Sequence, residues 1–301
     1  MATEAQDIRE GGTWTPLQRA KNDLIFVLVG IAIAIAERLP SFLLRAMGTI
    51  LGAIAYVLLP SARRRAIANL MVAGLDPKIA FASFCTLGRE LGDAIAHLDP
   101  KRDQPLLPFA PGAREVFEEA IAEGRGVVFA SAHIAPWERV ASTLVASGIP
   151  LTVVAREPYD PRFRRLYDRL RGARGVRTVY RGESGAGVGM VRVLKRKEVL
   201  GIPMDLRSRV PSIDVPFLGR PVPTAVGPAR LALRTGAVVI AGTASRRSDG
   251  RIGIAAKKIS LDDLGQDPEL ELTRRLNEAL TERIRALPEA WPWMHDRAKP
   301  T

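Results

Sequence analysis

Residues 126–138 read GVVFASAHIAPWE, and this stretch decides the fold. Residues 127–132 are a short, unbroken run of β-branched and small apolar residues, which predicts a strand buried on both faces. Pro136 suits the first turn of a helix, because its φ is already fixed and its missing N–H has no helical partner there. We therefore expect a strand that ends before His133, followed by a helix over residues 137–146.

Strand-like and helix-like segments alternate through the rest of the chain. The expected strands are residues 151–155, 176–180, 199–204 and 237–243, with an edge strand at 251–256. The expected helices are residues 114–123, 161–171, 188–195, 225–234 and 269–287. Repeated strand–helix units predict an α/β fold with a mainly parallel sheet flanked by helices on both faces.

The first third of the chain has a different composition. Residues 24–36 are continuously apolar, and a second apolar stretch, residues 42–59, is interrupted only by Arg45. Two such segments with basic clusters outside them predict an uncleaved anchor, or a helical pair lying in the membrane interface. A cleaved signal peptide and a soluble helical hairpin are the alternatives.

Length, charge and cysteine content limit the classes of protein to consider. The 301 residues suffice for one large α/β core with an extra segment, and the prolines between 99 and 112 mark a boundary. We therefore divide the chain into an N-terminal helical, membrane-associating segment (1–105) and an α/β domain (106–301). A net charge of +12, mainly from arginine, indicates an anionic partner. A single cysteine excludes an internal disulfide framework, and three histidines argue against a histidine-rich metal site.

His133 and Glu138 form a candidate catalytic pair. His133 follows a buried strand and Glu138 lies in the first turn of the next helix, where open α/β sheets place their chemistry. A turn between them allows the two side chains to meet. A carboxylate bound to one imidazole nitrogen fixes the tautomer and leaves the other nitrogen to take a proton from a hydroxyl. The alternative is a structural histidine bonded to a local backbone group.

Two further features concern ligands. Asp205 also lies just past a buried strand, where a carboxylate either takes part in a site or caps a turn. Eight arginines lie between residues 162 and 181 with few aromatic residues among them. Such a patch favours an anionic headgroup or an acidic carrier protein over nucleic acid, whose bases stack on aromatic side chains. No nucleophile elbow, Walker sequence or complete dinucleotide fingerprint is present.

Residues 133–138, HIAPWE, resemble the H-x4-E/D motif of glycerolipid acyltransferases. They are more similar to the H-x-G-N-W-E form found in the bacterial late lipid A acyltransferases, the lauroyl and myristoyl transferases. Further matches in the same order cover nearly the whole chain: Leu39-Pro40, residues 63–65, Arg156 with Pro158, Arg171 with Gly175, Asp205, residues 215–219, and Trp291, Trp293, His295 and Arg297. Ala135, Pro136 and Leu206 depart from the family pattern, so a phosphatidylinositol mannoside or a lysophospholipid remains an alternative acceptor.

The resemblance implies a function and a set of site residues. The reaction would transfer a fatty acyl chain from a thioester of acyl carrier protein or coenzyme A to a hydroxyl of an anionic membrane glycolipid, such as lipid A. His133 would act as general base assisted by Glu138, without a metal, a cofactor or an acyl-enzyme. Arg171 would hold an anionic group or the developing oxyanion, and Asp205 would position the substrate or an arginine. We add Trp137, Arg156 and Arg174 to the expected substrate-binding residues.

The same resemblance implies a location at the inner membrane, with the catalytic domain facing the cytoplasm and no nucleic-acid partner. Two other functions remain open. One is a thioester or ester hydrolase on the same scaffold, in which water replaces the lipid hydroxyl. The other is a non-enzymatic protein that binds anionic lipid or nucleic acid, which the net charge alone would favour.

Overall fold

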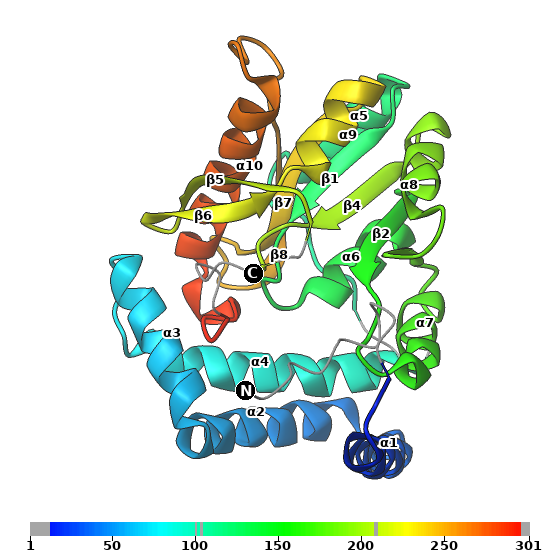
Figure 1. Ribbon diagram of the computed structural model, residues 1–301, viewed down its shortest axis with the longest axis vertical. Helices are drawn as coiled ribbons and strands as arrows, with labels where there is room; N and C mark the ends of the chain where they lie inside the picture. Colours follow the sequence, from blue (N-terminus) through cyan, green and yellow to red (C-terminus); the bar gives the residue numbers. More distant parts are fainter. Residues whose placement is uncertain (1–12, 100, 103–104, 208–209, 296–301) are drawn as a thin grey trace.

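A computed structural model describes residues 13–99, 101–102, 105–207 and 210–295; residues 1–12 of the N-terminal segment, and Arg297, lie outside this range. Its centre is a six-stranded sheet with the order β3-β2-β4-β1-β7-β8 (Figure 1). All neighbouring strands are parallel except β7 and β8. The strands are β1 (Val127–Ser131), β2 (Leu151–Arg156), β3 (Arg177–Arg181), β4 (Val199–Pro203), β7 (Val238–Arg246) and β8 (Ile252–Lys258). The predicted α/β class is confirmed.

Helices cover both faces of the sheet. They are α5 (Ala113–Ala122), α6 (Trp137–Ala146), α7 (Arg164–Gly172), α8 (Ala186–Lys195), α9 (Gly227–Thr235) and α10 (Pro268–Ala286), with short 3-10 turns at Pro161–Phe163 and Pro288–Ala290. Helix α6 connects β1 to β2 and α7 connects β2 to β3, so both connections lead toward the β3 edge of the sheet. Helix α8 connects β3 to β4 and α9 precedes β7, so these connections lead back toward β7. Because such connections are right-handed, α6 and α7 lie on one face and α8 and α9 on the other.

This reversal makes the carboxyl ends of β1 and β4 a topological switch point. The two strands are neighbours, but the helices that follow them, α6 and α9, leave toward opposite faces. A crevice opens between such helices, and open α/β sheets bind their ligands there. Both strands are buried along almost their whole length, in keeping with the unbroken apolar runs that predicted them.

Two details differ from the sequence-based expectation. Helix α6 has the predicted bounds, Trp137–Ala146, but Pro136 is the residue before the helix, with φ −98° and ψ 88°, and not part of its first turn. In addition, an antiparallel hairpin of β5 (Ser212–Phe217) and β6 (Arg220–Ala225) lies where no strand is predicted. This hairpin packs against α10. Three prolines in these strands conceal the pattern, because proline is disfavoured in the interior of a sheet.

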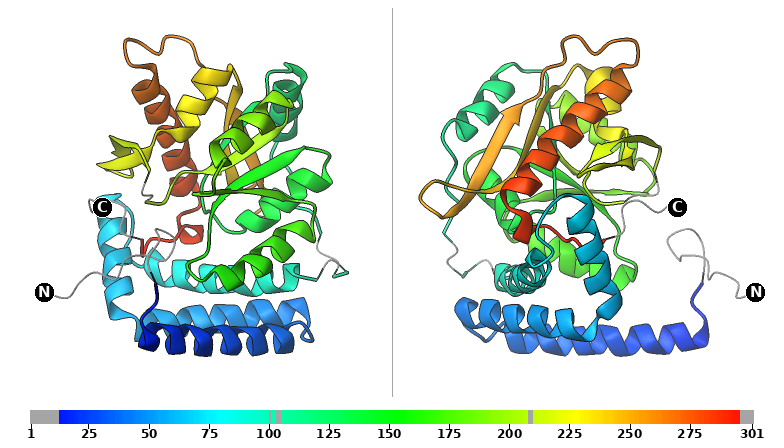
Figure 2. Two further views of the ribbon diagram at one scale, coloured as in Figure 1. Left: turned by 45° about the vertical axis from the view of Figure 1, so that its right-hand side comes forward. Right: turned by 90° about the vertical axis from the view of Figure 1, so that its left-hand side faces the viewer.

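The N-terminal third of the chain forms a layer of helices along one edge of the molecule (Figures 1 and 2). The helices are α1 (Pro16–Ala36), α2 (Ser41–Leu58), α3 (Pro60–Val72) and α4 (Ile79–His97). Helix α4 lies between α2 and the sheet, and α1 and α2 are outermost. Among the described residues, α2 is the one helix long and apolar enough to cross a membrane. Most of its large apolar side chains are exposed.

Candidate active site

His133 and Asp205 meet at the switch point of the sheet. Strands β1 and β4 pair with Ser131 opposite Pro203, and His133 and Asp205 each lie two residues further on. The imidazole Nδ1 lies 2.8 Å from Oδ1 of Asp205. The backbone N–H of His133 donates to Oδ2 of the same carboxylate over 2.9 Å. The carboxylate therefore fixes both the backbone and the ring of His133.

Asp205 is completely buried and accepts a third hydrogen bond, from the indole Nε1 of Trp291 at 2.8 Å. Burial raises the pKa of Asp205, but the charge of His133 and the hydrogen bonds from His133 and Trp291 outweigh it, so the pKa lies below its usual range. An ionised carboxylate only accepts hydrogen bonds, so Nδ1 carries the proton and Nε2 keeps a lone pair. This tautomer suits a general base.

The imidazole of His133 is partly open, with 31% of its side chain exposed. Burial lowers the pKa of His133, but the charge and hydrogen bond of Asp205, together with the charge of Glu138, raise it to a net value above the ordinary one. Trp137 packs edge-on against the ring, with centroids 5.6 Å apart. Asp205 and Trp137 therefore both constrain the ring.

Glu138 pairs with Arg171, where we expected it to bond to His133. Nη2 of Arg171 lies 3.0 Å from Oε1 of Glu138, and Nε lies 3.3 Å from Oε2. The hydrogen-bond partner of the imidazole is Asp205, so Glu138 acts on His133 through its charge. The remaining nitrogen of Arg171, Nη1, is buried and has no hydrogen-bond partner among the described residues.

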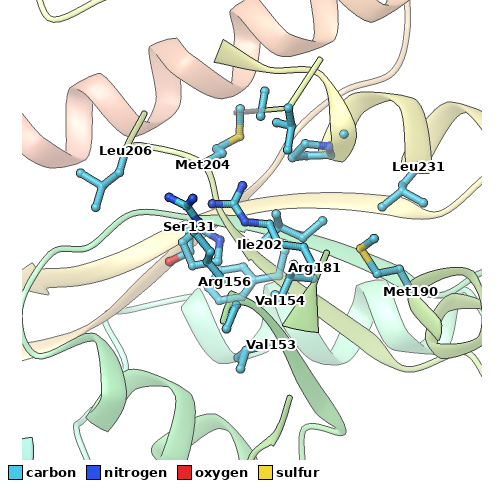
Figure 3. A pocket seen from close by; sticks show the side chains of 18 of the residues that line it. Ser131, Val153, Val154, Arg156, Arg181, Met190, Ile202, Met204, Leu206 and Leu231 are labelled. Atoms are coloured by element: carbon cyan, nitrogen blue, oxygen red, sulfur yellow. The ribbon is translucent and has the colours of Figure 1, made fainter. Parts of the chain in front are cut away.

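A cavity of about 750 Å³ extends from these residues along the ends of β1, β2 and β4 (Figure 3). His133, Trp137, Glu138 and Arg171 all line it. Its apolar wall comes from the sheet and from α6, α8 and α9: Phe129, Val140, Leu151, Val153, Val154, Met190, Ile202, Met204 and Leu231. Among the residues that the structure describes, no group of three or more His, Cys, Asp or Glu side chains could hold a metal ion.

The remaining predicted site residues separate into two groups. Arg156 lines the cavity together with Trp137. Arg174 does not line it, contrary to our expectation. Its Nη2 donates to the carbonyl oxygens of Asp99 and Arg102, at 2.9 and 3.1 Å, because the residue lies beyond the end of α7 and beside the end of α4. Arg174 therefore fixes the connection between the helical layer and the sheet.

The sequence reasoning missed the role of Trp291 and the partner of His133. The resemblance includes Trp291 but assigns it no role; it is 2% exposed and packs edge-on against Trp293, with centroids 4.8 Å apart. Asp205 carried a usable signal, since it follows its strand as His133 follows β1. The sequence does not show that these two strands are neighbours.

Comparison with known proteins identifies the family. The family model described as bacterial lipid A biosynthesis acyltransferase matches residues 15–300. The chain belongs to this family. The match confirms the resemblance drawn from the sequence and makes the protein an acyltransferase. No curated protein matches the chain.

Proposed function

We propose that this acyltransferase moves a fatty acyl chain from a thioester to a hydroxyl of a lipid A-type glycolipid, with His133 as general base. The observation that carries the proposal is the hydrogen bond of 2.8 Å between Nδ1 of His133 and the buried Asp205, at the wall of a largely apolar cavity. A carboxylate behind the ring favours the imidazolium that forms when Nε2 takes a proton.

The hydroxyl proton, the acyl group and the leaving thiolate can each be followed through the proposed reaction. Nε2 of His133 removes the hydroxyl proton of the acceptor as its oxygen attacks the thioester carbonyl carbon. The tetrahedral intermediate then collapses and the carbon–sulfur bond breaks. The leaving thiolate takes the proton from the imidazolium, and the acyl chain remains on the acceptor oxygen as an ester. This course needs no acyl-enzyme.

Arg171 is our candidate for stabilising negative charge in this reaction. Its guanidinium lines the cavity, and Glu138 holds it through two of its nitrogens. The third nitrogen, Nη1, is buried without a partner among the described residues, and a buried donor favours a ligand that accepts from it. The developing oxyanion of the tetrahedral intermediate is such a ligand. In this scheme Glu138 positions Arg171, and Asp205 positions His133.

The surroundings of the site support the two substrate classes. The apolar wall of the cavity offers a surface for an acyl chain, which is stabilised by its removal from water. The exposed apolar faces of α1 and α2 support association with a membrane, where a lipid acceptor is dissolved. We place the protein at the inner membrane with the sheet on the cytoplasmic side. Acyl carrier protein and coenzyme A both remain candidate donors.

The test is transfer of a labelled acyl chain into bacterial glycolipid by the wild-type protein and by His133→Ala. We expect the variant to lose at least about 1,000-fold in rate, because it lacks the base. Thermal unfolding would show whether the variant is folded. Undiminished transfer by a folded variant would overturn the mechanism. Release of free fatty acid without an acylated product would instead indicate a hydrolase.

A further inference from the structure

Two arginines lie side by side at the ends of neighbouring strands. Arg156 ends β2 and Arg181 ends β3, and the two residues are paired in the parallel register of these strands. Paired residues of parallel strands project to the same face of the sheet. Both side chains line the cavity that contains His133 (Figure 3). Two guanidinium groups are thus concentrated on one side of this cavity.

Helix α8 adds to the positive potential at this place. Two residues before the arginines, Val154 and Val179 form a register pair that projects to the same face. A Cβ on Gly189 of α8 would lie 3.8 Å from Val179, so α8 packs on this face. Its first turn contains no acidic residue, and Gly187 in that turn lines the cavity. The amino end of a helix carries partial positive charge, which reinforces that of the arginines.

Two acidic residues of the adjoining loops pair with α7. Glu157 follows β2 and Glu183 follows β3, and both carboxylates pair with Arg164 of α7. The cavity therefore has an apolar wall, the proposed general base His133, and a face formed by Arg156 and Arg181. A substrate that fills it must match all three.

We infer that Arg156 and Arg181 form a binding site for a phosphate group of a substrate. A planar guanidinium fork matches two phosphate oxygens, and two such forks side by side suit a phosphate group that accepts hydrogen bonds from both. This inference rests on the proposed function, because the phosphate is then anchored in the cavity where His133 acts. The phosphate can belong to the phosphopantetheine arm of the thioester donor or to a phosphorylated sugar of the acceptor.

The test compares substrates that differ only in the phosphate. The donor arm uses acyl-pantetheine against acyl-phosphopantetheine, and the acceptor arm uses a glycolipid with and without its phosphate. The proteins are the wild type, the double variant R156Q/R181Q and Arg177→Gln as the matched control. Arg177 lies on the same strand as Arg181, but it pairs with Glu198 and does not line the cavity. Arg177→Gln therefore removes one positive charge from the same strand but outside the proposed site.

We expect the wild type to prefer the phosphorylated form in one arm by about 10- to 100-fold in kcat/KM, the range of a charge-assisted hydrogen bond. The double variant should lose that preference while it keeps its rate on the form without phosphate, and Arg177→Gln should behave as the wild type. The arm that shows the effect identifies the source of the phosphate. A double variant that retains the wild-type preference, or loses rate equally on both forms, would overturn the inference.

Binding of inorganic pyrophosphate, followed by calorimetry, tests the site without turnover. We expect the wild type and Arg177→Gln to bind it about 10-fold or more tightly than R156Q/R181Q. Equal binding by all three proteins would overturn the phosphate site. Absence of acyl transfer by the wild type would count against the proposed function alone, since the calorimetric comparison would still stand.

Discussion

The α2–α4 pair and the central sheet are both rich in apolar residues, but they use them in opposite ways. The sheet buries large side chains such as Phe129 and Ile240. Helices α2 and α4 approach each other through glycine backbones instead. A Cβ on Gly48 would lie 2.1 Å from the carbonyl oxygen of Gly88, and one on Gly92 would lie 2.1 Å from that of Leu44. The large side chains of α2 mostly face outward.

These two ways of packing suit two different environments, water and lipid. Large side chains packed to high density stabilise a core that excludes water. Close contact between small residues is how helices associate in lipid, where burying apolar side chains gives no advantage over leaving them exposed. The α2–α4 contact is thus of the kind found between helices in lipid, whereas the sheet is packed like the core of a globular protein. We propose that the sheet carries the chemistry and the helical layer the membrane association, and four predictions test this division of roles.

The largest effect should come from Asp205→Asn, which acts on the chemistry of the sheet alone. Asparagine keeps the shape of the carboxylate but loses its charge, so the tautomer of His133 is no longer fixed. We expect kcat to fall about 1,000- to 10,000-fold. Affinity for lipid vesicles should not change. Asp214→Asn, at an exposed carboxylate on β5, is the matched control.

The pH dependence of the reaction sharpens this test. The pKa of His133 lies above its ordinary value, and the base acts only when neutral, so the wild-type rate should fall as the pH drops through that raised pKa. Without the charge of Asp205, burial dominates and the acid limb of kcat/KM should move to lower pH. An unchanged acid limb in Asp205→Asn would show that His133 is not the titrating group.

The second effect should be a loss of stability from Gly88→Ala in the helical layer. The added Cβ would lie 2.1 Å from the carbonyl oxygen of Gly48, so α2 and α4 must separate. We expect the free energy of unfolding to fall by about 2–3 kcal/mol. Gly30→Ala in α1 is the control, because nothing lies within 4 Å of a Cβ there and alanine favours a helix. Equal stability of the two variants would refute close packing of α2 against α4.

A third, smaller effect concerns the junction between the two regions. Asp93 of α4 pairs with Arg45 of α2 at 2.6 Å and lies 3.7 Å from Arg139 of α6. Nearby, Glu90 of α4 is buried and bonded to the backbone of Glu138. Burial, followed by the charges of Asp93 and Glu138, raises the pKa of Glu90 to about 8, although Arg139 and the backbone bond oppose the shift.

In the unfolded chain the carboxyl of Glu90 has a pKa of about 4.5 and loses its proton above that pH. In the folded protein the raised pKa lets Glu90 keep the proton to higher pH. Stability should therefore fall as the pH rises from about 4.5 to 8. Glu90→Gln removes this dependence, so its advantage over the wild type should grow as the pH rises. The measurement is the free energy of unfolding at pH 5 and 8.5. Parallel pH curves for both proteins would contradict a protonated Glu90.

Sequence reasoning reached most of the sheet, because a strand buried on both faces leaves an unbroken apolar run such as Val127–Ala130. It missed the β5–β6 hairpin, whose prolines hide the strand pattern. At the site, it found His133 and Asp205 separately but not their contact. That contact depends on β1 and β4 being neighbours, which is set by long-range pairing between strands far apart in the chain.

The smallest effect should be confined to the outer face of the helical layer. Ile50 of α2 is 59% exposed, and if α2 lies in lipid this surface is removed from water there. Ile50→Ser should then weaken binding to vesicles by about 1 kcal/mol, roughly fivefold, without lowering the free energy of unfolding. Leu270→Ser is the control: Leu270 is also exposed, at 40%, but it lies near the start of α10, the end of that helix farther from α2 (Figure 1). Vesicle co-sedimentation measures both, and equal losses in the two variants would mean that binding does not depend on the face formed by α2.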